Sequence, residues 1–198
     1  MFKILAATTN QGKIREIKEI LSDFEIISLK DTGIDVDVEE NGTTFSENAY
    51  IKAYEISKLT DLPVLADDSG LEIEALGGRP GVYSARYAGE NAPYSVKIAK
   101  LNEELKDVPK NERYAQFACA MCLILPNGRK IESVGVSCKG IILETPRGDN
   151  GFGYDPVFYS TQHKKTFSEM SMEEKNSVSH RKAALVALLD KIKGELTI

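Results

Sequence analysis

Apolar residues recur along the chain in two patterns, short runs typical of buried strands and longer stretches with the spacing of one helix face. Residues 2–7 form the first run, and Ile14, Ile17 and Leu21 follow at helical spacing. The polar turn between them, residues 8–13, is predicted to start a helix with Thr9 or Asn10 as its N-cap. The next strand is predicted over residues 25–29.

Further elements follow from alternation, capping and turn signals. Val36 and Val38 alternate with acids, which predicts an edge strand, and Thr44 with Glu47 is a capping box that opens a helix over residues 45–59. A helix is expected over residues 92–105. Two long strands, residues 113–125 and 130–139, flank an Asn-Gly pair that indicates a hairpin. The remaining expected elements are a strand at 140–144 and a C-terminal helix beginning near Ser179.

The central stretch, residues 64–89, carries the clearest chemical signal. An apolar run at 64–66 is expected to bring Asp67 and Asp68 to the end of a strand, with the two carboxylates on opposite faces. Ser69 and Gly70 are expected to turn the chain, and the glycines around Pro80 predict a shaped loop. One interpretation is a divalent-cation site, because Mg²⁺ binds one or two carboxylates together with water and phosphate oxygens. The alternative is that both acids cap a helix over residues 69–76.

Basic residues stand where two helices are predicted to start. Lys13 lies in the first turn of one helix, and His180, Arg181 and Lys182 open the last one. A cation is unfavourable at the positive end of a helix dipole, so a bound anion is one explanation. For Lys13 the alternative is an ordinary solvated lysine, and for the C-terminal group it is an acidic neighbour.

A second glycine-rich loop follows the strand at 140–144. Gly148, Gly151 and Gly153 surround Phe152, Tyr154 and Asp155. An aromatic face beside a carboxylate suits a purine or pyrimidine base. The alternative is that the two aromatic side chains pack in the core.

Composition narrows the class of protein. The chain has 198 residues, a net charge of −5 and three cysteines. A negative chain has no general attraction for nucleic acid or anionic membranes, and no stretch is long enough to span a bilayer or to act as a signal peptide. An odd number of cysteines fits a reducing, cytoplasmic location. Cys119 and Cys122 have metal-ligand spacing but lie in a predicted strand, where they face opposite sides, so buried thiols are expected, as for Cys138.

Several of these motifs, taken in order, resemble the Ham1 family of inosine/xanthosine triphosphate pyrophosphatases. They are TTNQGK at 8–13, Glu40 with TTFSENAYIKA at 43–53, the stretch 65–89, GFGYDPVF at 151–158 and EKNSVSHRKAAL at 174–185. The resemblance spans nearly the whole chain. It implies one domain over residues 1–198 of the α/β class, with two lobes around a long mixed β-sheet and flanking helices. It further implies an active site in the cleft between the lobes, and a homodimer.

The resemblance also implies a reaction, in which a non-standard purine nucleoside triphosphate (ITP, dITP or XTP) and water give the monophosphate and pyrophosphate with Mg²⁺. Carried over by position, Glu40 and Asp68 hold the metal, and Asp68 also activates water. The positions implied for substrate are Thr8, Thr9, Asn10, Gln11, Gly12, Lys13 and Lys52 for the triphosphate, Ser69, and Phe152, Gly153, Tyr154, Asp155, Lys175, His180 and Arg181 for the nucleoside. Arg181 and backbone N–H groups of the 152–155 loop are expected to donate to the 6-keto oxygen of the base, which disfavours adenine.

Two functions of other classes stay open from the residues alone. A nucleotidyl or phosphoryl transferase could use the same anion-binding helix starts. In a non-catalytic nucleotide-binding module, Asp68 would be a helix cap only.

Overall fold

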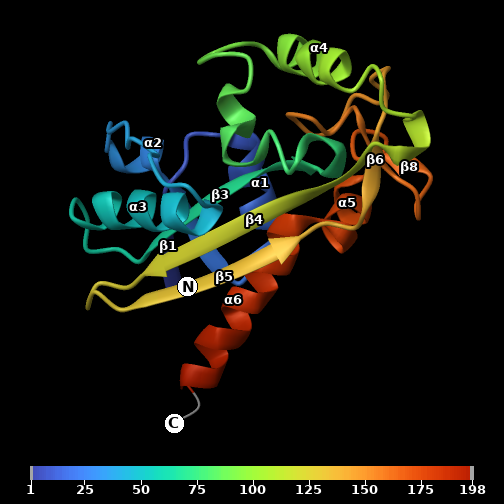
Figure 1. Ribbon diagram of the computed structural model, residues 1–198. Coiled ribbons are helices and arrows are strands. Elements are labelled where there is room, and N and C mark those ends of the chain that lie inside the picture. Colours follow the sequence, from blue (N-terminus) through green and yellow to red (C-terminus); the bar gives the residue numbers. More distant parts are fainter. Residues whose placement is uncertain (1, 197–198) are drawn as a thin grey trace. The chain divides into compact units, whose positions relative to one another are not determined.

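The computed structural model describes residues 2–196, and in it eight strands form one mixed sheet in the order β2-β1-β3-β4-β6-β7-β8, with β5 paired to β4 (Figure 1). The chain divides into two compact units. The first unit comprises the chain up to Asp68, Cys119–Gly135 and the chain from Arg181 onward. The second unit comprises Ser69–Ala118 and Val136–His180. The expected class, α/β with a long mixed sheet and flanking helices, is confirmed, whereas a site in a cleft between lobes stays a prediction.

The first unit begins as the apolar pattern predicts. Strand β1 (Phe2–Ala6) pairs in parallel with β2 (Phe24–Ser28) and with β3 (Val64–Ile73). Helix α1 (Gln11–Ile20) connects β1 to β2, and Asn10 is its N-cap. The expected strands, helix and cap are therefore confirmed, and only a short helix after β2, α2 (Leu29–Thr32), was not expected.

The segment before α3 (Phe45–Ser57) differs from the prediction. The capping box of Thr44 and Glu47 is present and opens the helix as expected. The predicted edge strand around Val36 and Val38 is wrong, because residues 34–43 form no strand. Side chains from α3 hold this segment instead, since the backbone N–H of Gly42 donates to Asn48 Oδ1 at 2.8 Å.

Alternation along the strands of the first unit separates two apolar cores. One face contributes Ile4, Leu65 and Cys119 to a core with α1 and α6 (His180–Leu196). The opposite face contributes Leu5, Ala66 and Cys122 to a core with α3. Cys119 and Cys122 thus face opposite sides as predicted, and burial raises the pKa of each thiol to about 12. Both cysteines are buried, protonated thiols.

Strand β3 corrects the expectation for the central stretch. The strand does not end at Asp68 but continues through Ser69 and Gly70 to Ile73. The predicted turn at Ser69 and Gly70 is therefore wrong, and so is the alternative helix over residues 69–76. Leu71 and Ile73 are fully buried, and their two-residue spacing gives this half of the strand its own apolar face. The two aspartates consequently lie inside a strand rather than at its end.

The second unit is built around a single apolar core. It contains Leu71, Phe117, Phe158 and Phe167, with aromatic ring centroids 4.5–5.7 Å apart. Strand β6 (Gly140–Ile142) pairs antiparallel with β4 (Tyr114–Ile124) and with β7 (Phe158–Ser160), which pairs with β8 (Lys165–Thr166). Its helical elements are α4 (Tyr94–Glu104), α5 (Met172–Val178) and the short 3₁₀ helices η1 (Glu74–Leu76), η2 (Gly81–Arg86) and η3 (Lys110–Glu112).

The predictions for the remaining elements are mixed. Helix α4, the strand at β6 and the start of α6 at His180 are confirmed. The Asn-Gly hairpin is confirmed too, because β4 and β5 (Lys130–Val136) pair and Leu125 N–H donates to the Arg129 carbonyl at 2.9 Å. The short strands β7 and β8 and the helix α5 were not expected. Within residues 2–196, no helix is both long and apolar enough to cross a bilayer.

Candidate functional site

The turn between β1 and α1 is held together by hydrogen bonds to the side chains of Thr8 and Asn10. Asn10 Oδ1 accepts the backbone N–H groups of Gly12 at 2.9 Å and of Lys13 at 3.2 Å, and Thr8 Oγ1 accepts that of Asn10. The ammonium of Lys13 lies 3.1 Å from Asp67 Oδ2. Lys13 is therefore not a freely solvated lysine, and a carboxylate of β3 already offsets its charge at the start of α1.

Asp67 occupies the face of β3 that carries Leu65, toward α1 and α6. Its Oδ2 accepts a hydrogen bond from Nη2 of Arg181 at 2.9 Å and also pairs with the Lys13 ammonium. The same guanidinium forms an ion pair with Glu16 of α1. Burial disfavours the charged form of Asp67, but the Lys13, Arg181 and Lys52 cations outweigh it and hold the pKa of this carboxyl well below its usual range. Asp67 is thus the carboxylate at the centre of a buried charge network.

Asp68 occupies the opposite face of β3, toward α3. Its Oδ2 accepts the side-chain amide of Asn48 at 2.9 Å, and burial raises the pKa of the Asp68 carboxyl despite this hydrogen bond. The same Asn48 accepts the Gly42 N–H through its Oδ1. One asparagine therefore fixes both the Asp68 carboxylate and the segment that carries Glu40.

Lys52 lies one helical turn after Asn48 and joins the same group. Its ammonium lies 2.8 Å from Glu40 Oε1 and donates to the Asp67 carbonyl at 3.1 Å. Glu40 is close enough to Asp68 for its negative charge to raise the pKa of that carboxyl further. The structure thus brings together Lys13, Glu40, Lys52 and Asp68 from separate parts of the first unit.

The expected base loop lies in the second unit. Asp155 Oδ2 accepts the Phe152 N–H at 2.8 Å and the Lys175 ammonium at 2.7 Å. That ammonium also lies 4.9 Å from the centroid of the half-exposed Phe152 ring. Gly151 has φ +76°, and a Cβ there would lie 2.2 Å from Asp155 Oδ2, so only glycine fits. Phe152 is consequently held by its own backbone, by Asp155 and by Lys175.

The side chain of Tyr154 does not present an aromatic face to a ligand. It is 2% exposed, and its hydroxyl donates to the Ser84 carbonyl at 2.9 Å. The alternative considered for this residue, packing in the core, is confirmed. The half-exposed Phe152 is the aromatic face of the loop, while a nucleotide contact from the backbone of Tyr154 stays a prediction.

The start of α6 brings His180 and Arg181 into buried positions, whereas Lys182 is exposed. His180 stacks on Phe117, with ring centroids 4.9 Å apart, and Arg181 is fully buried in the network with Asp67 and Glu16. For Arg181 the acidic-neighbour explanation is confirmed. Its predicted contact with the base, like that of His180, stays a prediction, as does the role of Ser69, which follows Asp68 in β3.

Sequence reasoning missed Asn48, Glu16 and the central position of Asp67. Asn48 precedes Lys52 by four residues and Glu16 follows Lys13 by three, spacings that place each pair on one helix face. That spacing is the signal that could have identified both partners.

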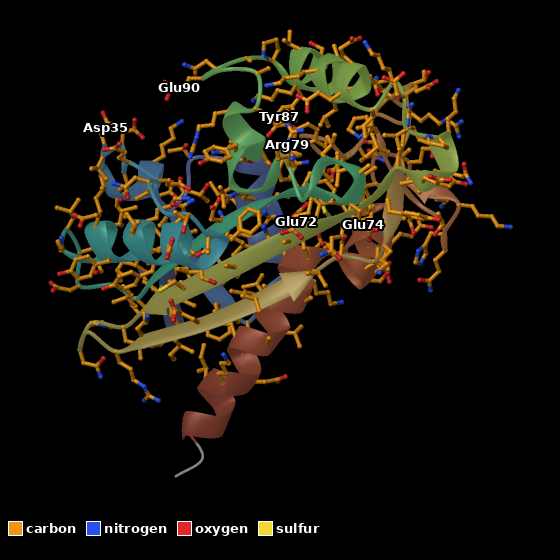
Figure 2. The ribbon with its side chains drawn as sticks, in the orientation of Figure 1. Asp35, Glu72, Glu74, Arg79, Tyr87 and Glu90 are labelled. Atoms are coloured by element: carbon orange, nitrogen blue, oxygen red, sulfur yellow. The ribbon has the colours of Figure 1, made fainter. Side chains whose placement is uncertain are left out.

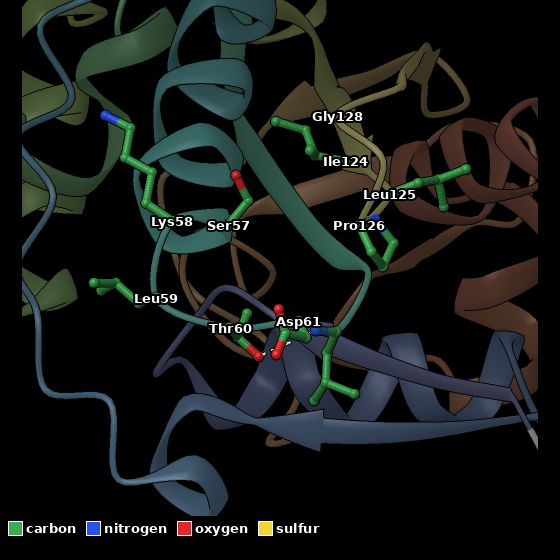
Figure 3. A pocket seen from close by; sticks show the side chains of 10 residues that line it. Ser57, Lys58, Leu59, Thr60, Asp61, Ile124, Leu125, Pro126 and Gly128 are labelled. Atoms are coloured by element: carbon green, nitrogen blue, oxygen red, sulfur yellow. Dashed lines mark hydrogen bonds between the residues drawn. The ribbon is translucent and has the colours of Figure 1, made fainter.

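Two surface cavities lie elsewhere. One of about 430 Å³ belongs to the first unit and lies beside Ser57, Thr60, Asp61 and Pro126 (Figure 3). The other, of about 420 Å³, belongs to the second unit and is lined by Tyr114 and Lys139 together with Glu72 and Glu74. Figure 2 labels the two glutamates. Neither cavity is lined by a predicted site residue.

Comparison with known proteins agrees with the motifs. The sequence model of the Ham1 family matches residues 4–191. A dITP/XTP pyrophosphatase of Clostridium perfringens is 50% identical, over 99% of this chain and all of the relative, and one of Geobacter sulfurreducens is 48% identical over 96% of each. The solved structure of the Staphylococcus aureus Ham1 protein is similar with a TM-score of 0.85 and 42% identity, covering 98% of this chain and 99% of that one. This chain belongs to the Ham1 family.

Proposed function

We propose that this protein hydrolyses non-standard purine nucleoside triphosphates, among them dITP, ITP and XTP, to the monophosphate and pyrophosphate. The observation that carries the proposal is the convergence of Glu40 and Asp68 with Lys13 and Lys52 in the first unit. Carboxylates beside lysines at a helix start suit a metal-bound triphosphate. The names of relatives 47–50% identical over nearly the whole chain support the same reaction.

The donor set suits Mg²⁺ better than a softer metal. Across residues 2–196, no three His, Cys, Asp or Glu side chains are gathered so that they could enclose a metal by themselves. Glu40 and Asp68 supply hard carboxylate oxygens, and Mg²⁺ commonly takes one or two of these with water and substrate phosphate completing the shell. Bound there, the ion would offset negative charge on the phosphate oxygens.

The side chains divide the remaining work. Lys13, Lys52 and the N–H groups at the start of α1 bind the triphosphate and offset its charge. A water oxygen forms the new bond to the α-phosphorus as the bond from this phosphorus to the bridging oxygen breaks, and pyrophosphate leaves. Asp68 accepts the proton of that water as the general base. Asn48 keeps the Asp68 carboxylate in place.

Recognition of the base is proposed for the second unit. The half-exposed Phe152 ring offers a stacking face, and Lys175 with Asp155 fixes the loop that carries it. Stacking alone does not choose among purines, so polar groups must do so. The loop's backbone N–H groups suit a 6-keto oxygen and would face the amino group of adenine donor to donor.

The family resemblance also supports a cytoplasmic homodimer. Three free cysteines fit a reducing compartment. Light scattering of the purified chain tests the assembly, and a monomer at micromolar concentration would contradict it.

The direct test is to incubate the protein with Mg²⁺ and dITP, XTP, GTP or ATP and to identify the products. We expect monophosphate and pyrophosphate from dITP and XTP, with GTP and ATP poorly used. Turnover that requires an added acceptor and releases no pyrophosphate would indicate a transferase. Binding of dITP with no turnover would indicate a non-catalytic module.

The proposed metal site gives a further prediction. Glu40→Gln should raise the Mg²⁺ concentration for half-maximal activity by about tenfold, because an amide is a weaker ligand than a carboxylate. A Mg²⁺ titration of dITP hydrolysis measures it. Glu39→Gln is the matched control, since that side chain is exposed and adjacent. An unchanged metal requirement in Glu40→Gln would shift the assignment to Asp37 or Glu39.

Lys13 at the start of α1 gives another testable prediction. Lys13→Ala should raise KM for dITP and XTP by about tenfold each, the cost of one charged hydrogen bond to phosphate. Added salt should inhibit the wild type more than the variant, because the lost contact is electrostatic. Lys18→Ala, an exposed lysine on the same helix, is the control. A changed ratio of dITP to XTP activity would place Lys13 near the base instead.

A further inference from the structure

A buried lysine lies on α4, outside the groups assigned above. Lys97 is 4% exposed, and burial lowers the pKa of its ammonium. Its Nζ lies 4.3 Å from the ring centroid of Tyr94, one turn earlier on the same helix. Among the described residues, no hydrogen bond or ion pair of this ammonium is formed. The face of the tyrosine ring is thus the aromatic surface that this ammonium contacts.

Tyr94 in turn contacts the centre of the base loop. Its ring meets that of Tyr154 edge to face, with centroids 5.2 Å apart and an interplanar angle of 90°. A Cβ on Gly153 would lie 3.5 Å from Cε1 and Cζ of Tyr94, so Gly153 lies next to the ring. Burial raises the pKa of the Tyr94 hydroxyl, and the charge of Asp155 adds to the shift. Tyr94 therefore lies close to three consecutive residues of the loop.

The loop is then held at two places. Asp155 and Lys175 fix the Phe152 end through the backbone N–H and the ion pair. Tyr94 packs against Gly153 and Tyr154, and the Tyr154 hydroxyl is bonded to Ser84. Attraction between a cation and a ring face favours the ring orientation that keeps the contact.

We propose that Lys97, acting through the Tyr94 ring, is a positioning residue for the loop that presents Phe152 to the base. This inference rests on the proposed function. It predicts that Lys97 affects how tightly the nucleotide binds. The turnover rate of the bound nucleotide should hardly change, because neither Lys97 nor Tyr94 is among the side chains that we assign to the metal, the triphosphate or the attacking water.

The same helix provides a matched control. Lys100 Nζ lies 4.3 Å from the centroid of the Tyr87 ring and donates to the Tyr87 carbonyl at 2.6 Å. Tyr87, however, donates its hydroxyl to Glu104, which also pairs with Arg79, and Figure 2 shows Arg79 and Tyr87 side by side. Lys100 thus repeats the cation–ring pair on a tyrosine whose hydroxyl is held by Glu104.

The experiment compares Lys97→Met, which keeps the length and removes the charge, with Lys97→Arg, Tyr94→Phe and Lys100→Met. For dITP we expect Lys97→Met to raise KM by about five- to tenfold, a value between those of an exposed and a desolvated cation–ring contact, with kcat within about twofold. Lys97→Arg and Tyr94→Phe keep cation and ring, so they should stay within about twofold of wild type in both constants. Thermal unfolding shows that each variant is folded at the assay temperature.

Equal KM changes in Lys97→Met and Lys100→Met would overturn the proposal, as would a fall in kcat without a change in KM. Equilibrium binding of dITP without divalent metal gives a readout independent of turnover. If wild type binds dITP but does not hydrolyse it, the proposed function fails while the binding comparison still decides the role of Lys97. If wild type hydrolyses dITP and Lys97→Met binds it as wild type does, only the positioning role fails.

Discussion

Asp68→Asn is expected to lower the turnover of dITP by about 10² to 10⁴, because an amide neither accepts a proton from water nor serves well as a Mg²⁺ ligand. The fold should be nearly unaffected. Asn48 donates to Asp68 Oδ2, and an asparagine at position 68 can present its own carbonyl oxygen to the same amide. The free energy of unfolding should therefore change by about 1 kcal/mol or less.

Steady-state kinetics at saturating Mg²⁺ and urea unfolding measure the two quantities. Asp61→Asn is the control, an exposed aspartate of the first unit that lines the cavity in Figure 3. Activity of Asp68→Asn within a few-fold of wild type would remove Asp68 from the mechanism. A loss of activity that only parallels a loss of folded protein would assign it a structural role.

Much of the first unit follows from local sequence. The spacing of Ile14 and Ile17, the Asn10 cap and the capping box at Thr44 each involve residues within one or two turns, so the pattern contains the information. Alternation of side chains along a strand likewise predicts that Asp67 and Asp68 lie on opposite faces of β3. The contacts confirm it, because Asp67 contacts Lys13 and Arg181 whereas Asp68 contacts Asn48.

The errors arise where distant contacts override local preference. Ser69 and Gly70 favour a turn by composition, yet β3 continues because Leu71 and Ile73 are buried in the core of the second unit. Val36 and Val38 have the alternation of a strand, but the segment is bound by Asn48 of α3 instead of a neighbouring strand. Neither outcome can be read from a window of ten residues.

The charge network has the same origin. Arg181 meets Asp67 across 114 positions of sequence and Glu16 across 165. The excess of cations at the start of α6 indicates that some negative group must lie there, either a ligand or an acidic side chain. Only the folded chain shows that Asp67 and Glu16 are the negative groups that pair with Arg181. A mutation of Arg181 is therefore expected to affect the stability of the protein.

Arg181→Met is expected to destabilise the protein by about 3–5 kcal/mol, because it leaves two buried carboxylates without their common cation. Glu16 and Asp67 are each 2% exposed, so water cannot replace the guanidinium. The loss should be partly recovered in the double variant Glu16→Gln/Arg181→Met, where Asp67 keeps Lys13 and the second buried charge is absent. Unfolding of the wild type, both single variants and the double variant forms a complete cycle, and additive effects would contradict the network.

The double variant then allows the predicted role of Arg181 in base selection to be tested on a folded protein. If the guanidinium donates to the 6-keto oxygen, kcat/KM for dITP and XTP should fall by about 10² or more while the weak activity on ATP hardly changes, since a donor facing adenine's amino group contributes nothing to its binding. Glu16→Gln alone, which retains Arg181 and its contact with Asp67, is the control for selectivity. A uniform fall for dITP, XTP, GTP and ATP would mean that Arg181 acts on the phosphates through Asp67 and Lys13, leaving base selection to the loop that carries Phe152.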